Sequence, residues 1–286
     1  MAALLERDAQ VTVLSRDPVR AHAKLGDVEA VGWDLMSEPA PAAALSGRDA
    51  VVHLAGEPVA QRWSAKAKRA IHDSRVIGTR NLLDGIGDSE ERPRILVSSS
   101  AIGYYGPHGE EPLDEDARPG TDFLARVCVE WEQEAQRATE LGLRVVQVRT
   151  GVVLDRSGGA LAKMLTPFRL GVGGPVAGGR QYIPWIHVDD VLGMILAALA
   201  DERWSGPINA TAPTPVPNRD FSRALGHALS RPSALPVPGV ALHALYGEMA
   251  EIVTTGARVM PAKALVLGFE FRHPELGEAL RAALDS

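Results

Sequence analysis

Short apolar runs separated by helix-length segments limit how this chain folds more than any other feature. Runs rich in Val, Ile and Leu cover residues 11–15, 28–33, 49–54, 94–99 and 144–150. Segments with a helical pattern cover residues 18–24, 39–45, 64–87 and 121–141. Strands that alternate with helices are joined by right-handed crossovers and form a parallel sheet. The sequence therefore predicts an α/β fold with a Rossmann-like, doubly wound parallel sheet.

The composition indicates a globular protein with a small-molecule partner. The chain has 286 residues, of which 45% are hydrophobic and 23% charged, and its net charge is −6. This length suffices for one large α/β domain and a small appendage. A net negative charge disfavours nucleic acid and anionic membranes as the main partner. We therefore expect a small-molecule substrate, no nucleic acid and no membrane.

Cysteine usage and the N-terminal residues bear on the compartment. Cys128 is the only cysteine, so the chain forms no internal disulfide and no paired-cysteine metal site. The first residues lack the pattern of a signal peptide, and no apolar stretch is long enough to cross a membrane. We expect a cytoplasmic protein without a bound metal.

The chain begins in an unusual way for a dinucleotide-binding fold. Such folds open with a strand and a glycine-rich turn, and neither GxGxxG nor GxxGxxG occurs before the strand at residues 11–15. We therefore expect the first strand and the glycine loop to be missing. We hypothesise that the functional protein carries about 20 more residues upstream that encode both.

The second half of the chain is less regular. A glycine-rich loop at 171–179 and a helix at 188–200 precede two proline-rich stretches, at 210–217 and 231–239. Prolines stop helices and stiffen linkers, so the second of these stretches marks a boundary. We predict a cofactor-binding domain at 1–233 and a small, mostly helical domain at 234–286 that completes the substrate side.

Several motifs resemble one family of oxidoreductases. The stretch SSSAIGYYG, residues 98–106, is similar to the Ser/Tyr signature of extended short-chain dehydrogenase/reductases, the nucleotide-sugar epimerase group. The stretches LAGEPVAQRW, IPWIHVDD and the tail from Leu245 resemble an atypical "epimerase family" branch with a short C-terminal domain of unassigned function. The resemblance spans nearly the whole chain and implies an NAD(P)-dependent oxidoreductase.

The residues after the strand at 11–15 bear on the choice of cofactor. In a dinucleotide fold this position meets the adenosine ribose, where an acidic residue favours NAD and an arginine favours NADP. Ser15 and Arg16 stand there, so NADP is favoured and NAD is less expected. The neighbouring Asp17 leaves NAD open, because its carboxylate is able to bind a ribose hydroxyl.

Further cofactor contacts are expected at the ends of the next two strands. The resemblance places Asp34 and Leu35 against the adenine ring, although a plain strand-end aspartate is an equally good interpretation. In the run Leu54, Ala55 and Gly56, the two small residues allow the backbone to approach a ribose or pyrophosphate closely. The resemblance also places Arg75 near the phosphates, with a solvated helix charge as the alternative.

The reactive end is expected at Ser100 and Tyr105, with Tyr104 as a second candidate acid. Related enzymes pair a tyrosine with a lysine four residues later, because the ammonium lowers the tyrosine pKa. No lysine occurs between Lys68 and Lys163, so that pair is absent. A serine-lined strand end and a tyrosine packed beneath the cofactor are the structural alternatives.

Two motifs favour structural interpretations. His187, Asp189 and Asp190 suggest an acid–base group, but an aspartate before an apolar helix is a common N-cap, which we favour. Cys128 lies in an apolar helix and predicts core packing. No HExxH, CxxC or GxSxG occurs, so metal and hydrolase chemistry has no support.

These features lead to two hypotheses of different class. The first is an NADP-dependent oxidoreductase that transfers a hydride to or from a small carbonyl, alcohol or sugar-nucleotide substrate. The alternative is a non-catalytic NADP-binding protein that has lost the Tyr/Lys pair. The helices at 64–87 and 121–141 allow a homodimer, as in related folds.

Overall fold

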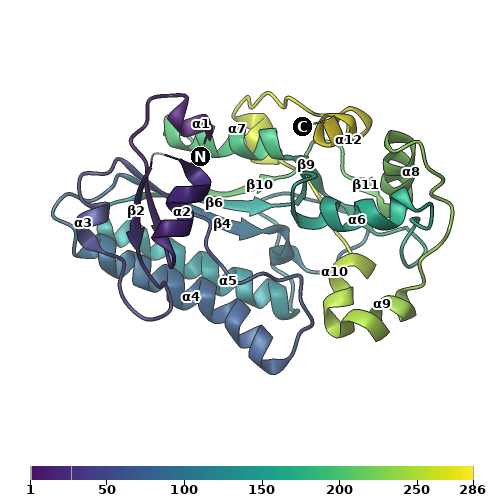
Figure 1. Ribbon diagram of the computed structural model, residues 1–286, viewed down its shortest axis with the longest axis horizontal. Coiled ribbons are helices and arrows are strands. Elements are labelled where there is room, and N and C mark those ends of the chain that lie inside the picture. The colour runs from purple at the N-terminus through teal and green to yellow at the C-terminus, as the bar shows by residue number, and fades with distance from the viewer. Residues whose placement is uncertain (1, 27, 286) are drawn as a thin grey trace.

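A four-stranded and a two-stranded parallel sheet, covered by helices, form the centre of the computed structural model, which describes residues 2–26 and 28–285. The larger sheet has the strand order β10-β6-β4-β3, with the bounds β3 Ala50–His53, β4 Ile95–Ala101, β6 Arg144–Thr150 and β10 Gly206–Ala210. The smaller sheet pairs β1 (Thr12–Ser15) with β2 (Glu29–Gly32). Helices α4 (Ala65–Gly87) and α5 (Phe123–Gln136) cover one face of the larger sheet (Figure 1), and α7 (Val188–Ala200) covers the other. The predicted Rossmann-like α/β fold is confirmed.

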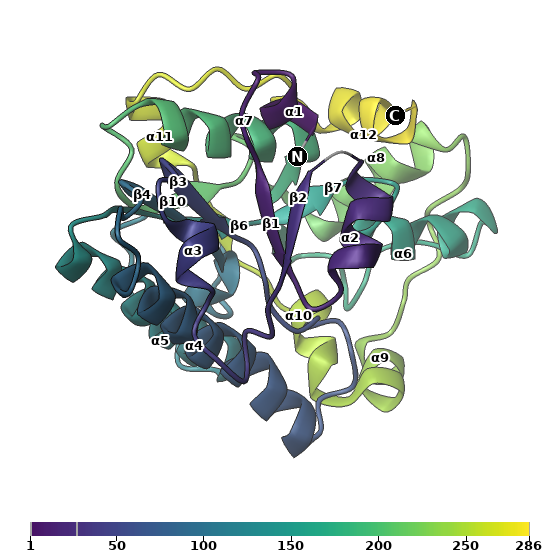
Figure 2. The same cartoon turned by 60° about the vertical axis from the view of Figure 1, so that its left-hand side comes forward.

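The two sheets pack against a common core, but no hydrogen-bonded pair of described strands joins them. Within the described residues, no strand pairs with the free edge of either β1 or β3. Leu14 of β1 and Val51 of β3 nevertheless pack against the same apolar cluster. Figure 2 shows the β1–β2 pair in front of the larger sheet. The chain therefore reverses its winding between β2 and β3, which is where doubly wound folds hold ligands at the carboxyl ends of their strands.

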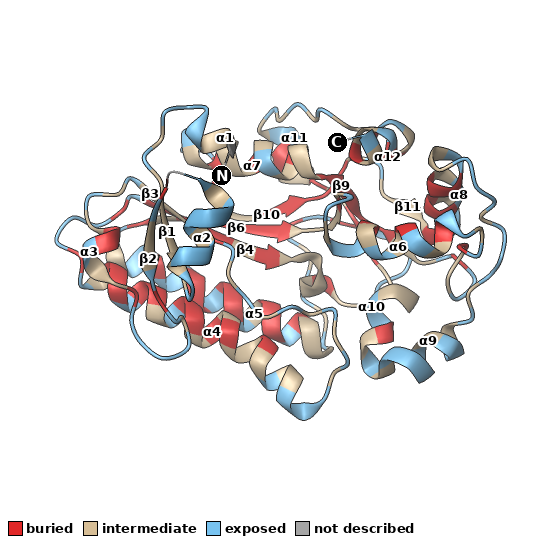
Figure 3. Ribbon diagram, in the orientation of Figure 1, coloured by how far each residue is buried: buried red, intermediate tan, exposed pale blue. Residues whose placement is uncertain are grey.

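Helix α4 illustrates how the sequence produces the layers. The Ser64 hydroxyl accepts the N–H of Ala67 at 3.1 Å and begins the helix. Ile71, Leu82 and Ile86 are at most 2% exposed and lie on the inner face, which Figure 3 shows as a buried stripe. An apolar stripe at helical spacing has to pack against a sheet or another helix, which accounts for the position of α4.

The remaining elements are shorter and lie between or after the strands and helices named above. In the first part of the chain they are α1 Ala2–Leu5, α2 Pro18–Leu25, α3 Ala42–Leu45, η1 Ile102–Tyr105, β5 Pro112–Leu113, η2 Arg137–Leu141, β7 Val152–Leu154, α6 Gly159–Arg169, β8 Tyr182–Ile183, β9 Trp185–His187, β11 Val216–Pro217 and α8 Asn218–Ala228. In the C-terminal region they are α9 Gly239–Tyr246, η3 Gly247–Ala250, α10 Glu251–Thr254, β12 Arg258–Val259, α11 Ala262–Val266 and α12 Leu276–Asp285.

The C-terminal region is mostly helical, as expected, and it packs on the first part of the chain. Strand β12 pairs in parallel with β5, and Leu280 of α12 lies in the same core cluster as Phe221 of α8. The boundary between 1–233 and 234–286 stays a prediction.

A glycine in α4 makes one contact of the fold testable. A Cβ on Gly85 would overlap the backbone carbonyl oxygen of Ala40, whereas a Cβ on Gly87 would come no nearer than 3.9 Å to Leu141. We expect Gly85→Ala to destabilise the protein by about 1–3 kcal/mol, because a backbone atom has to move. The matched change Gly87→Ala should be neutral or slightly stabilising. Urea denaturation of both variants checks this, and equal midpoints would contradict the close approach.

No helix among the described residues combines the length and the apolar character needed to span a bilayer.

Candidate functional site

A buried polar network lies at the carboxyl ends of β4, β6 and β10. Arg149 at the end of β6 is 2% exposed, and its Nε and Nη2 each donate to the Glu132 carboxylate of α5 at 2.8 Å. Ser100 of β4 donates to the same carboxylate at 2.6 Å. The Tyr105 hydroxyl accepts from Arg149 at 2.9 Å and donates to Asn209 of β10 at 2.6 Å. Five elements, β4, η1, α5, β6 and β10, are thus connected in one network around the Arg149 guanidinium.

The Arg149 charge is balanced by Glu132 within the network. Burial by itself lowers the pKa of Arg149, but the hydrogen bond and the charge of Glu132 raise that pKa above its usual range. Glu115 closes the far side: its backbone oxygen accepts from Arg149, and its carboxylate accepts the N–H of Asn209 at 2.9 Å and of Lys263 at 3.1 Å. Buried charges are tolerated only when they are paired and hydrogen-bonded, and both conditions hold here.

The structure brings the two predicted catalytic residues together but buries both. Ser100 is 3% exposed and Tyr105 is fully buried. Burial raises the pKa of Tyr105 to about 12, with Arg149 opposing the rise. In this geometry the Tyr105 hydroxyl contacts only protein groups, those of Asn209 and Arg149.

Ser99 and Tyr104 are the partly exposed neighbours of these residues. The Tyr104 ring stacks on the Arg149 guanidinium, with the Cζ atom 3.5 Å from the ring centroid. The hydroxyls of Ser99 and Tyr104 form no hydrogen bond within residues 2–26 and 28–285. They are therefore available to a ligand, and of the two candidate acids Tyr104 is the accessible one.

Helix α5 presents apolar residues where a Tyr/Lys pair would be expected. The Cα of Gly103, in the turn after β4, faces Leu124 and Cys128, because a Cβ there would lie 3.4 Å from Leu124 and 3.8 Å from the Cys128 sulfur. These two residues have the spacing of four that such a pair requires. Burial raises the pKa of Cys128 to about 12, so its thiol stays neutral. The predicted core packing of Cys128 is confirmed by its burial.

The residues after β1 separate into a capping group and an exposed cation. The Asp17 carboxylate accepts the N–H of Arg20 at 2.9 Å and caps α2, and the Ser15 hydroxyl bonds the Asp17 backbone at 3.2 Å. Arg16 is exposed and forms no ion pair with the residues that the structure describes. Asp17 therefore has a structural task, whereas Arg16 is open to a ligand.

Asp34 and Leu35 follow β2 and differ in their surroundings. The exposed Asp34 accepts the N–H of Met36 at 3.0 Å, which is the geometry of a turn-forming aspartate. The Leu35 side chain packs against Gly78 of α4, where any Cβ would overlap it. Leu35 thus anchors this loop on α4, and Asp34 stands at its surface.

The loop after β3 is held in place by α4. Leu54 is 62% exposed, although it is a large apolar residue. The backbone N–H of Glu57 donates to Ser74 at 2.9 Å, and Arg75 donates to the Glu57 carbonyl at 3.1 Å. The Arg75 guanidinium lies directly behind Gly56, since a Cβ there would be 3.3 Å from its Cζ. Ala55 and Gly56 are thus part of a preorganised loop with a cation beneath it.

His187, Asp189 and His273 form the one described group whose donor atoms, all within 4.8 Å of one another, have metal-like spacing. The His187 Nδ1 already accepts the N–H of Asp189 at 3.1 Å, so His187 caps α7 and the predicted aspartate cap is wrong. The Asp189 oxygen faces the Arg272 guanidinium at 3.2 Å. Asp190 accepts the N–H groups of Arg272 and His273. The cluster therefore joins α7 to the C-terminal tail, and the buried Nε2 atom of His187 has no hydrogen-bond partner among the described residues.

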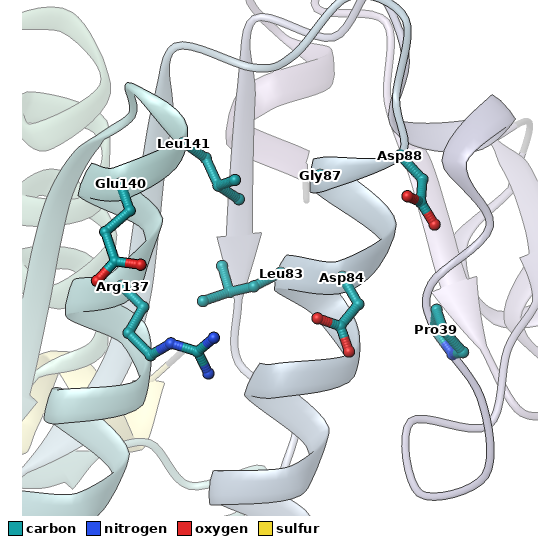
Figure 4. A pocket seen from close by; sticks show the side chains of 8 residues that line it. All are labelled: Pro39, Leu83, Asp84, Gly87, Asp88, Arg137, Glu140 and Leu141. Atoms are coloured by element: carbon teal, nitrogen blue, oxygen red, sulfur yellow. The ribbon is translucent and has the colours of Figure 1, made fainter.

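A surface hollow of about 510 Å³ lies away from this chemistry. Figure 4 shows that it is lined by the C-terminal end of α4 and by η2, through Pro39, Leu83, Asp84, Gly87, Asp88, Arg137, Glu140 and Leu141. Since α4 ends just before β4 begins, the hollow lies at the opposite end of the strands from Ser100. Its side chains bring no reactive group together.

The fold and the loops at its strand ends define a Rossmann-like, nucleotide-cofactor class of protein. Residues 1–209 match the model of the NAD dependent epimerase/dehydratase family, and residues 237–283 match a domain of unknown function, DUF1731. The chain belongs to the NAD dependent epimerase/dehydratase family.

Named relatives extend over most of the chain. The chloroplastic SDR39U1 homolog of Arabidopsis thaliana is 46% identical over 242 residues, which are 84% of this chain and 70% of that protein. The crystal structure of the human epimerase family protein SDR39U1 (isoform 2) with NADPH has a TM-score of 0.87 and 32% identity. That comparison covers 100% of this chain and 94% of the human one.

Proposed function

We propose that this protein is an NADP-dependent oxidoreductase that transfers a hydride between the nicotinamide and a small carbonyl, alcohol or sugar-nucleotide substrate. One observation after β1 carries the proposal. Asp17 caps helix α2, whereas Arg16 is exposed and forms no ion pair with the described residues. An arginine at this position favours a 2′-phosphate. The human relative that was crystallised with NADPH supports the same cofactor.

The proposed cofactor path runs along the carboxyl ends of β1, β2 and β3. Ser15 and Arg16 would hold the adenosine ribose and its phosphate, and Asp34 and Leu35 would lie at the adenine. Leu54, Ala55 and Gly56 would contact the ribose or pyrophosphate, with Arg75 supplying positive charge from behind. Partial burial lowers the pKa of Arg75. The usual pKa of an arginine is so high that the side chain stays charged.

The reactive end is proposed to lie over Ser99 and Tyr104, next to the Arg149 network. Ser100 and Tyr105 then act as positioning residues: Tyr105 binds the guanidinium on which the Tyr104 ring stacks, and Ser100 binds the Glu132 carboxylate that pairs with it. The guanidinium would place a fixed positive charge beside the reactive end, where the lysine is missing. A cytoplasmic location and a homodimer through α4 and α5 remain predictions.

The Arg16 assignment predicts a change in cofactor preference. We expect Arg16→Asp to weaken NADPH binding by about one to two decades, because a charge-assisted contact of roughly 1.5–3 kcal/mol is lost. NADH binding should stay nearly constant. Fluorescence titration of both nucleotides measures this, with Arg20→Asp in the adjacent helix as the matched control. Equal losses for the two nucleotides would refute the assignment.

Two tyrosine variants separate chemistry from positioning. Tyr104→Phe should reduce kcat for NADPH oxidation and leave the stability and the NADPH affinity unchanged. Tyr105→Phe should lower the unfolding free energy by about 1–3 kcal/mol, because the buried Asn209 oxygen loses its donor. Steady-state kinetics and urea denaturation of both variants provide the readouts. Full turnover by Tyr104→Phe would remove Tyr104 from the reaction.

A non-catalytic NADP-binding protein is the second candidate. The observation that favours it is the pair Leu124 and Cys128, which places apolar groups where a proton-transfer pair is expected. NADPH oxidation over a broad panel of aldehydes and ketones discriminates the two functions. Tight NADPH binding without any oxidation would favour the second candidate, and measurable turnover would exclude it.

A further inference from the structure

Arg258 is a partly buried cation for which the protein supplies no acceptor. It lies on β12, and its Nε atom is shielded from solvent and has no hydrogen-bond partner. Within the described part of the chain, the guanidinium forms neither an ion pair nor a hydrogen bond. In Arg149, by contrast, all three guanidinium nitrogens are engaged.

An aromatic ring and two tight backbone contacts hold Arg258 in place. Its Cζ atom lies 5.5 Å from the centroid of the Tyr182 ring, which supports the guanidinium plane. Gly256, two residues earlier, is in close contact with the backbone of Tyr182, and its carbonyl accepts the N–H of His108 at 2.9 Å. The strand itself pairs with β5, with Arg258 opposite Pro112. The cation is therefore positioned by the fold before any ligand arrives.

The strand that carries Arg258 is connected to the network at the reactive end. The Asn209 side chain donates to the Met260 carbonyl at 2.9 Å, while its oxygen accepts from Tyr105. Thr211 donates to the carbonyl of Val259 at 3.3 Å. The strand is thus tied to the residues that hold Tyr105, and a group bound at Arg258 would lie beside Tyr182 of β8.

Shielded charges are normally paired, because an unpaired one loses hydration without compensation. Arg16 is also unpaired, but it is exposed and keeps its water. For Arg258, the partner that would compensate the lost hydration is an anion from outside the chain, since a planar guanidinium suits a carboxylate or a phosphate. We propose that Arg258, supported by Tyr182, forms a subsite for an anionic group of the substrate, an inference that rests on the proposed function.

The test measures anion binding directly. Inorganic pyrophosphate and malonate are titrated calorimetrically into the NADPH-saturated protein, so that the two probes separate phosphate from carboxylate recognition. We expect Arg258→Gln to weaken the preferred probe by about tenfold or more, and Arg258→Lys to have an intermediate effect. The control Arg223→Gln removes the same charge from exposed helix α8 and should change neither titration. Thermal midpoints confirm that the variants are folded.

Equal binding of both probes by the wild type and Arg258→Gln would overturn the proposal. A second arm measures NADPH oxidation with 4-carboxybenzaldehyde and with its uncharged methyl ester. Preference for the acid that disappears in Arg258→Gln would support the subsite, and equal use of both would contradict it. If no carbonyl is reduced but anion binding depends on Arg258, the proposed function fails while the subsite stands.

Discussion

Glu132→Gln should lower the free energy of unfolding by about 3–5 kcal/mol, the largest effect that we expect from a single substitution. The change keeps the size of the side chain but leaves the Arg149 charge buried without its counter-ion. Ser100 also loses a charged acceptor. Because a domain has a total stability of only roughly 5–15 kcal/mol, urea denaturation should show a large shift of the midpoint.

The same helix offers a matched control. Glu130 lies two residues earlier, and its side chain is 50% exposed in a pair with His72. Glu130→Gln should cost less than about 1 kcal/mol, as for other exposed pairs. The double variant Glu132→Leu with Arg149→Met should lose less than the sum of its parts, because replacing both charges avoids the unpaired one. Additive losses would show that the two side chains do not act as a pair.

Acid should destabilise the protein through His53. This residue at the end of β3 is 4% exposed, and its Nε2 has no hydrogen-bond partner. Burial, with a smaller effect of the Arg75 charge, lowers the pKa of His53 from 6.5 to about 4. Since the folded-state pKa is below the unfolded one, the unfolded chain binds the proton first as the pH falls. Stability is therefore unaffected by His53 above pH 6.5 and decreases between pH 6.5 and 4.

The expected loss from His53 is about 2 kcal/mol at pH 5 and about 3 kcal/mol at pH 4, at about 1.4 kcal/mol per pH unit. His53→Gln removes the titrating group. The loss of unfolding free energy at pH 5 and pH 4 should therefore be smaller than in the wild type by these amounts. His243→Gln, at an exposed position on α9, serves as the control. The measurement is urea denaturation at pH 7, 5 and 4. An identical pH dependence in the wild type and His53→Gln would contradict the assigned pKa.

Much of the fold could be predicted from residue patterns. The apolar runs at 11–15, 49–54 and 144–150 became β1, β3 and β6 with end points shifted by one residue at most. Such runs leave few alternatives, because their side chains have to be covered on both faces. The predicted aspartate cap of the helix at 188–200 is wrong. His187 caps α7, because its imidazole accepts the N–H of Asp189.

The candidate site could be predicted only in outline. Parallel strands end at a common edge, so residues that follow strands, such as Ser100 and Arg16, were expected near a ligand. Arg149 also ends a strand, and Glu132 lies between Glu130 and Glu134 on α5, but neither residue was singled out. For Glu132 the helical period contains a signal. Glu130 and Glu134 lie on one face of α5, and Glu132 lies on another.

By itself the sequence determined the class of fold and the absence of a Tyr/Lys pair, and it predicted the edge of the sheet at which a ligand is expected. These follow from local patterns and from spacing along the chain. The tertiary structure alone decided that Tyr105 is buried and Tyr104 accessible, that Glu132 neutralises Arg149, and that the Arg258 guanidinium has neither an ion pair nor a hydrogen bond among the described residues. The reason is physical: burial and charge pairing depend on contacts between segments far apart in the chain, such as β4, α5 and β12, which no local pattern encodes.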